Sequence, residues 1–92
     1  IQKEQTSTNS VVLKVQIETS SSKMPTVPSN FNGLKGVEVY ISGKFYKYTY
    51  GQCTDQASIK DKLKEARSAG YNTAFIVAFE NGDLQAALKK LK

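Results

Sequence analysis

Residues 37–51 read VEVYISGKFYKYTYG, and this stretch decides the fold class. Its first half alternates aliphatic residues with other types up to Ile41, a Ser-Gly pair follows, and its second half alternates tyrosines with other residues. Two alternating runs joined by a short glycine-containing connection are typical of a β-hairpin. The stretch therefore predicts two antiparallel strands, over residues 37–41 and 44–50.

The alternation also predicts which side chains share a face of the hairpin. Tyr46, Tyr48 and Tyr50 fall on one face, and a tyrosine stripe at period two is usually core packing. The residues between them then point to the opposite face, together with one tyrosine of the first strand. That opposite face therefore holds Tyr40, Phe45, Lys47 and Thr49.

Two further strands and a helix are predicted on either side of the hairpin. Residues 11–18 alternate strictly, which indicates a half-buried strand with Lys14, Gln16 and Glu18 on its polar face. A helix begins at a cap on Thr54 or Asp55, runs to about residue 69 and carries a narrow apolar stripe, and Gly70 supplies its left-handed stop. Residues 72–79 form a fourth strand that is apolar on both faces. The apolar stripe of the helix consists of Ile59, Leu63 and Ala66.

The remaining segments set the domain limits. Residues 19–36 contain both prolines and form an irregular connection, for which Phe31 and Leu34 are the expected anchors to the core. Residues 1–10 have the composition of a polar linker, and residues 83–91 have the spacing of a short amphipathic helix. We therefore expect one α+β domain over residues 11–92, a four-stranded antiparallel sheet with helices on one face and a short C-terminal helix.

Composition excludes several kinds of chemistry. The 92 residues make one domain, and 13 Lys and Arg against 8 Asp and Glu give a formal charge of +5, which favours anionic partners. The chain has no His and only Cys53, so we expect no catalytic residues, no metal site and no cofactor. No apolar run is long enough to span a membrane. Because the chain starts at Ile1 rather than Met, we expect a processed product or a piece of a longer protein.

The face opposite the tyrosine stripe is the predicted binding surface. Aromatic rings beside amide, hydroxyl and ammonium groups suit sugar rings or unstacked bases, because a ring stacks on the apolar face while polar groups hydrogen-bond the substituents. The candidate binding residues are Lys14, Gln16, Tyr40, Phe45, Lys47 and Thr49.

Three segments resemble the SPOR (sporulation-related) family. The segment YKYTYG at 46–51 resembles the Tyr-Arg-Val-x-Val-Gly pattern on the family's third strand, and VQI at 15–17 resembles its first-strand Val-Gln-Val. The stretch AGYNTAFIVAF at 69–79 resembles its helix end and last strand. Over residues 11–79 the sequence is similar to SPOR-like modules attached to Bacteroidetes N-acetylmuramoyl-L-alanine amidases.

The resemblance implies a fold, a ligand and a location. The fold is the ribonucleoprotein-like βαββαβ sandwich, here with residues 19–36 in place of the first helix. The ligand is the glycan strand of peptidoglycan after its stem peptides have been removed, and the location is the bacterial cell envelope. In position, Gln16 stands for the family's Gln, Lys47 for its Arg and Gly51 for its Gly. The chain would be the non-catalytic, wall-targeting part of a larger cell-wall hydrolase or division protein.

Two other functions fit the same architecture. A four-stranded sheet with a basic balance suits single-stranded nucleic acid, although the third strand lacks the Gly-Phe-x-Phe aromatic core of an RNA-recognition motif. Alternatively, the apolar last strand and the leucines of 83–91 form a protein-interaction or dimerisation surface. Salt-dependent binding of oligonucleotides would favour the first of these alternatives, and a tight dimer would favour the second.

Overall fold

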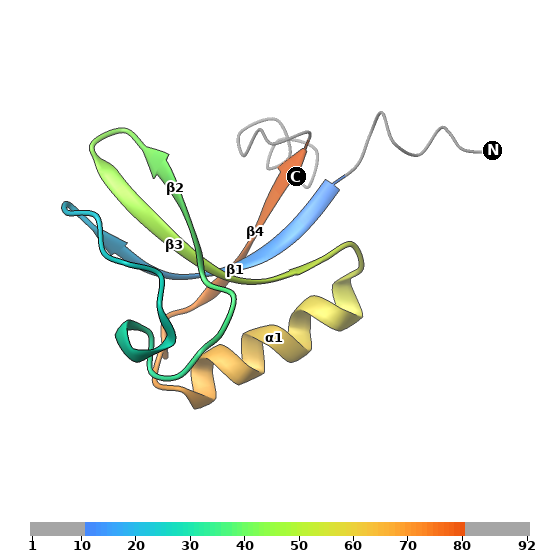
Figure 1. Ribbon diagram of the computed structural model, residues 1–92. Coiled ribbons are helices and arrows are strands. Elements are labelled where there is room, and N and C mark those ends of the chain that lie inside the picture. Colours follow the sequence, from blue (N-terminus) through green and yellow to red (C-terminus); the bar gives the residue numbers. More distant parts are fainter. Residues whose placement is uncertain (1–10, 81–92) are drawn as a thin grey trace.

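The computed structural model describes residues 11–80, which form one antiparallel sheet with a helix packed on it (Figure 1). The α+β prediction is therefore confirmed. The predicted linker at 1–10 and the predicted helix at 83–91 lie outside the described residues. In chain order the elements are β1 (Val11–Ser20), the 3-10 turn η2 (Pro28–Asn30), β2 (Glu38–Ser42), β3 (Phe45–Cys53), α1 (Gln56–Ser68) and β4 (Phe75–Glu80).

The strand order in the sheet is β2-β3-β1-β4. The central strand β1 is antiparallel to both of its neighbours, β3 and β4, so those two strands run in the same direction. Because α1 connects β3 to β4 and β1 lies between them, this half of the molecule is a split β-α-β unit. The β2–β3 hairpin extends the sheet on the other side, and its pairs Val39–Tyr48 and Ile41–Tyr46 place these tyrosines on the face that the alternation predicts. Ser42 pairs with Phe45, so the turn lies at Gly43 and Lys44 rather than at the predicted Ser42-Gly43.

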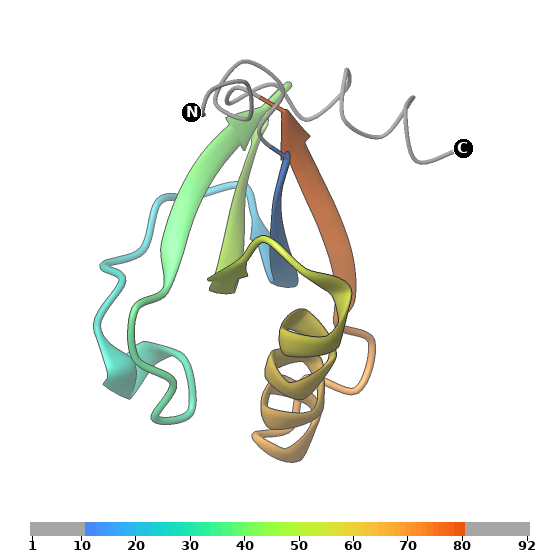
Figure 2. The same cartoon turned by 90° about the vertical axis from the view of Figure 1, so that its right-hand side faces the viewer.

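One face of the sheet is covered by two segments that lie side by side (Figure 2). Helix α1 covers part of it, and residues 21–37, which contain only the short turn η2, cover the rest. Phe31 and Tyr48 are both fully buried, and their ring centroids lie 5.1 Å apart. Leu34 joins the same core, so both predicted anchors are confirmed. The irregular connection therefore supplies the apolar surface that a second helix would otherwise provide.

Helix α1 begins and ends as its sequence predicts. The side chain of Asp55 accepts a hydrogen bond from the backbone N–H of Ser58 at 3.0 Å. Hydrogen bonds from Ser58 lower the pKa of Asp55. Gly70, with a φ of 111°, follows the last turn. Ile59 and Ala66 are buried against the sheet, as predicted from their spacing. The helix is thus fixed to one face and leaves the opposite face of the sheet, hereafter the distal face, without it.

Two irregularities change the alternation along the central strands. The register of the β1–β3 pairing shifts between Leu13 and Val15, where β3 contains one extra residue. Gly51, with a φ of 76°, lies in this β-bulge, and pairing continues beyond it to Cys53. A second shift lies between Gln16 and Glu18, so the predicted placement of these two side chains on one face is wrong. Beyond the shift Glu18 pairs with Tyr48, a core residue, and Thr19 takes its place on the distal face. Alternation of residue types in the sequence cannot reveal an extra residue in a strand, because the shift exists only in the pairing with the neighbouring strand.

Candidate functional site

The six predicted binding residues share the distal face. Gln16 pairs with Thr49 on one side and with Phe75 on the other, and Tyr40 pairs with Lys47. Residues that pair directly across an antiparallel ladder point to the same side of the sheet. Lys14 lies two residues before Gln16, and Phe45 lies two residues before Lys47, with no register shift in the β1–β4 and β2–β3 pairings. Because alternate residues of a strand share a face, Lys14 and Phe45 also point to the distal face. The structure thus brings together one polar and aromatic surface over all four strands.

Two side chains of the edge strand β2 cross β3 to reach the central strand β1. The hydroxyl of Tyr40 donates a hydrogen bond to Oε1 of Gln16 at 2.8 Å. The ammonium of Lys14 forms an ion pair with Oε1 of Glu38, also at 2.8 Å. We call these four residues the cross-sheet network. They lie over β3, and Thr49 beneath them is only 2% exposed.

Aromatic contacts extend the cross-sheet network to the last strand. The rings of Tyr40 and Phe79 meet edge to face, with centroids 5.0 Å apart and planes at 86°. The ammonium of Lys14 lies 5.1 Å from the centroid of Phe79, within the range of a cation–π interaction. Burial raises the pKa of Tyr40, so its hydroxyl stays protonated and remains a donor at neutral pH. The cross-sheet network is therefore a packed and hydrogen-bonded structure.

The expectation that the candidate residues are solvent-exposed is correct for some of them only. Phe45 is exposed and Lys47 is half-buried, whereas Gln16 and Thr49 are buried, at 8% and 2%. The physical reason is the length of Tyr40, whose side chain extends from an edge strand across the middle of the sheet. Parity along a strand predicts the face of a residue but not how far a neighbour's side chain reaches over it.

A hollow next to Gln16 contains residues that the sequence did not single out. It has a volume of about 260 Å³ and lies at the second register shift, beside the start of β4. Phe75 forms one wall and is 50% exposed. The sequence indicated a strand that is apolar on both faces, so it did not distinguish Phe75 from the core residues of that strand. The signal that could have found it is the period of two, which places Phe75 on the face opposite Ala74 and Ala78. We call this the Phe75 hollow; its lining residues are Gln16, Ile17, Glu18, Thr19, Thr73 and Phe75.

Within the Phe75 hollow, the amide of Gln16 keeps a weakly engaged donor. Its Oε1 accepts from Tyr40 at 2.8 Å, but its Nε2 lies 3.4 Å from Oγ1 of Thr19, a long contact. A second hollow of about 270 Å³ lies farther along the distal face, between Lys14, Gln52 and Phe79. Tyr40 also lines this second hollow. The cross-sheet network thus has a hollow at each end.

The described part of the chain offers little for other chemistry. No group of three or more His, Cys, Asp or Glu side chains within residues 11–80 is placed to hold a metal ion. Cys53 is half-buried, packs against the core and forms no disulfide. No helix within residues 11–80 has the length and apolar character needed to cross a membrane.

The comparisons with known proteins leave the site to be judged on its own geometry. The chain matches no family model, no curated protein and no solved structure.

Proposed function

We propose that this domain is a non-catalytic module that binds the glycan strands of peptidoglycan from which stem peptides have been removed. It would act in the bacterial cell envelope and direct a larger cell-wall hydrolase or division protein to the wall. The observation that carries the proposal is the Phe75 hollow, where a half-exposed aromatic ring lies near the amide of Gln16 and the hydroxyl of Thr19.

This combination of groups is suited to a sugar ring. An aromatic side chain packs on the apolar face of a pyranose, while side-chain donors and acceptors orient its substituents. Phe75 supplies the ring, Gln16 supplies an N–H donor, and Thr19 and Thr73 line the same space with hydroxyl groups. Hydroxyl and acetamide groups of an amino sugar both donate and accept hydrogen bonds, which matches this mixed set.

The same face offers contacts for more than one sugar. Phe45 is 48% exposed at the start of β3, and Lys47 lies between it and Thr49 on the same face. A repeating polymer gains affinity when several weak subsites are engaged together. The two exposed phenylalanines and Lys47 therefore favour an extended ligand.

Sedimentation with purified sacculi tests the proposal. We expect the domain to bind sacculi after treatment with an amidase, which removes stem peptides, and to bind untreated sacculi weakly. Equal binding to both, or binding to neither, would contradict the proposal. Calorimetry with free denuded glycan oligosaccharides then gives the affinity.

A matched pair of variants locates the site. Phe75→Ala removes the ring of the Phe75 hollow and is expected to weaken binding about tenfold, since covering the exposed half of a phenylalanine ring contributes roughly 1–1.5 kcal/mol. Ile41→Ala is the control, because Ile41 is 70% exposed on β2 but belongs to the opposite face of the sheet. Equal losses in both variants would show that binding is not specific to the distal face.

Exposed aromatic rings and a positive charge also suit single-stranded nucleic acid. Titration with single-stranded oligonucleotides at several salt concentrations separates this alternative. If the protein binds oligonucleotides with an affinity that falls steeply with salt, and does not bind glycans, the nucleic-acid alternative would replace the proposal.

A further inference from the structure

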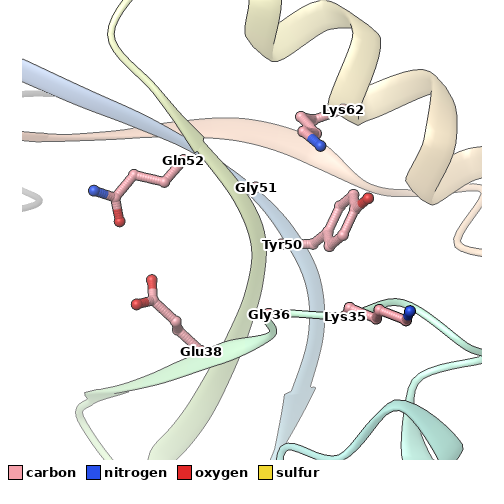
Figure 3. A pocket seen from close by; sticks show the side chains of 7 residues that line it. All are labelled: Lys35, Gly36, Glu38, Tyr50, Gly51, Gln52 and Lys62. Carbon is pink, nitrogen blue, oxygen red and sulfur yellow. The ribbon is translucent and has the colours of Figure 1, made fainter.

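A hollow of about 410 Å³ lies where the last residues of β3 extend beyond Glu38, the first residue of β2 (Figure 3). The last β2–β3 pair joins Glu38 to Thr49, so the final residues of β3 have β1 on one side and, within residues 11–80, no strand on the other. Backbone groups on an unpaired strand edge are available to a ligand. We call this space the lysine hollow, since Lys35 and Lys62 line it from different segments.

Lys62 is held in place at the rim of the lysine hollow. A Cβ atom built on Gly51 would come within 2.8 Å of Cγ of Lys62, which shows that the lysine stem lies directly over the bulge. The ammonium of Lys62 is 5.5 Å from the ring centroid of Tyr50 and 3.5 Å from Oε1 of Glu65. Because the stem already packs against backbone and ring, little side-chain entropy remains to be lost when the ammonium binds an anion.

The balance of charge in the lysine hollow is positive. Lys35 forms no ion pair with any residue in 11–80, and Lys62 has only the 3.5 Å contact with Glu65. The carboxylate of Glu38, which also lines the hollow, is paired with Lys14 at 2.8 Å. Glu65 accepts the hydroxyl hydrogen bond of Tyr50. Among residues 11–80, the carboxylates of Glu38 and Glu65 are therefore each engaged by another side chain, whereas Lys35 is in no ion pair and Lys62 is in one long ion pair.

The lysine hollow is continuous with the distal face through one residue. Figure 3 shows Lys35, Tyr50 and Lys62 on one side of β3 and Gln52 with Glu38 on the other. Gln52 also lines the second hollow of the distal face, beside Lys14 and Phe79. It is exposed, and its side chain makes no hydrogen bond within the described residues. A polymer on the distal face can thus extend past Gln52 to the two lysines.

We propose that the lysine hollow binds the carboxylate of an acidic sugar, with Lys35 and Lys62 as its charged partners. The inference rests on the proposed function, because it places this acidic sugar within the glycan strand that the distal face binds. In a denuded strand, every second sugar is an N-acetylglucosamine that carries a lactyl ether. Hydrolysis of the amide bond to the stem peptide leaves that lactyl group as a free carboxylate. The lysine hollow therefore explains why removal of the peptide would favour binding.

Two ligands and three variants test the inference by calorimetry. Denuded glycan oligosaccharides are compared with chito-oligosaccharides of the same length, which lack the lactyl carboxylate. We expect the domain to prefer the acidic ligand by about tenfold, as for a charge-assisted hydrogen-bonded contact. Lys35→Gln and Lys62→Met should remove most of this preference while leaving the affinity for the neutral ligand unchanged. Met retains the apolar stem over Gly51, so the second variant removes the charge and keeps the packing.

Lys60→Gln is the matched control, because Lys60 is an exposed lysine of the same helix that does not line the hollow. We expect this variant to bind both ligands as the parent protein does, and circular dichroism confirms that all three variants fold. Equal affinity of the parent protein for the two ligands, or equal losses of both ligands in the lysine variants, would overturn the inference while leaving the proposed function intact. If neither ligand binds the parent protein, the proposed function fails and the inference fails with it.

Discussion

The hydroxyl of Tyr40 donates to Oε1 of Gln16 across 2.8 Å, although the two residues lie on strands separated by β3. This bond closes the cross-sheet network over Thr49 and buries the amide of Gln16. One edge tyrosine thus converts the middle of a polar face into a packed layer, and the two hollows and the exposed Phe45 remain accessible around it.

Tyr40→Phe removes this hydrogen bond and leaves Oε1 of Gln16 buried without its donor. We expect the free energy of unfolding to fall by about 1–2 kcal/mol, since an unsatisfied buried acceptor costs more than a lost exposed bond. Urea denaturation measures the change. Tyr46→Phe is the control: the Tyr46 hydroxyl makes no hydrogen bond within residues 11–80, and a similar loss there would show that the Tyr40 bond has no special role.

Tyr48 is the largest fully buried side chain of the core. Tyr48→Ala should lower the free energy of unfolding by about 3–5 kcal/mol, because it removes the ring that packs on Phe31 and leaves a cavity. Tyr48→Phe keeps the ring and removes only the hydrogen bond that the hydroxyl accepts from the backbone N–H of Met24 at 2.7 Å. It should cost about 1 kcal/mol in the same denaturation experiment. Comparable losses in the two variants would mean that the hydrogen bond, not the ring, dominates.

Gly51→Ala combines two penalties at the β3 bulge. An L-residue at a φ of 76° is strained by about 1–2 kcal/mol, and the new Cβ would collide with the Lys62 stem. We expect a total loss of about 2–4 kcal/mol in chemical denaturation. Gly43→Ala is the matched control, because Gly43 has a φ of 62° and open space around its Cβ position, so it should show only the strain.

A double variant separates the two penalties at Gly51. Adding Lys62→Ala to Gly51→Ala removes Cγ and Cδ of Lys62, which lie 2.8 and 3.2 Å from the new Cβ, but keeps Cβ at 2.9 Å, so it should recover part of the steric loss. If the double variant is no more stable than Gly51→Ala alone, the collision with Cγ and Cδ of Lys62 contributes nothing.

The bond from the Tyr50 hydroxyl to Glu65 links two titrations. This bond, with smaller contributions from burial and from the charge of Glu65, raises the pKa of Tyr50 from 10.0 to about 12, and the bond lowers the pKa of Glu65 from its ordinary value of 4.5. The raised tyrosine pKa means that the contribution of this bond to stability is present below pH 10 and is lost as the pH rises toward 12. The lowered glutamate pKa means that the contribution is present above pH 4.5 and is lost as the pH falls below that value.

Tyr50→Phe tests this linkage by NMR titration of the Glu65 carboxyl carbon. We expect the pKa of Glu65 to rise in the variant, because the donor that favours its charged form is gone. Lys62→Met should raise it less, since the charge of Lys62 is the weaker cause of the shift. An unchanged pKa in Tyr50→Phe would show that the hydrogen bond does not form in solution.

Lys47 is a suitable probe of glycan binding on the distal face. It is half-buried and forms no ion pair within the described residues, so Lys47→Ala should change the melting temperature little and weaken glycan binding several-fold. Gln16→Ala is a poor probe, because the burial of Gln16 and its bond from Tyr40 make a loss of stability inevitable. Undiminished glycan affinity in a folded Lys47→Ala variant would move the binding site away from the start of β3.

The local elements of this protein could be predicted because each depends on residues close together in the chain. Alternation defined the strands, Asp55 and Gly70 marked the two ends of α1, and Phe31 stood out as an anchor in an otherwise polar connection. These signals come from backbone periodicity and capping, which neighbours in sequence determine. The α+β fold class follows from the order of the elements alone.

The candidate site was predicted as a face of the sheet but not as a shape. The sequence placed Gln16, Tyr40 and Thr49 on one side, yet it gave no sign that Tyr40 would cover the other two. It also missed the register shift that brings Thr19 beside Phe75, because a bulge depends on how one strand pairs with its partner.

Sequence by itself therefore determined which residues form strands and helix, and it determined the face of the strand residues except where the second register shift displaces Glu18. Tertiary structure alone decided which side chains of that face remain accessible. Exposure depends on how far side chains reach from neighbouring elements, as with Tyr40 of β2 over Thr49 and Lys62 of α1 over Gly51.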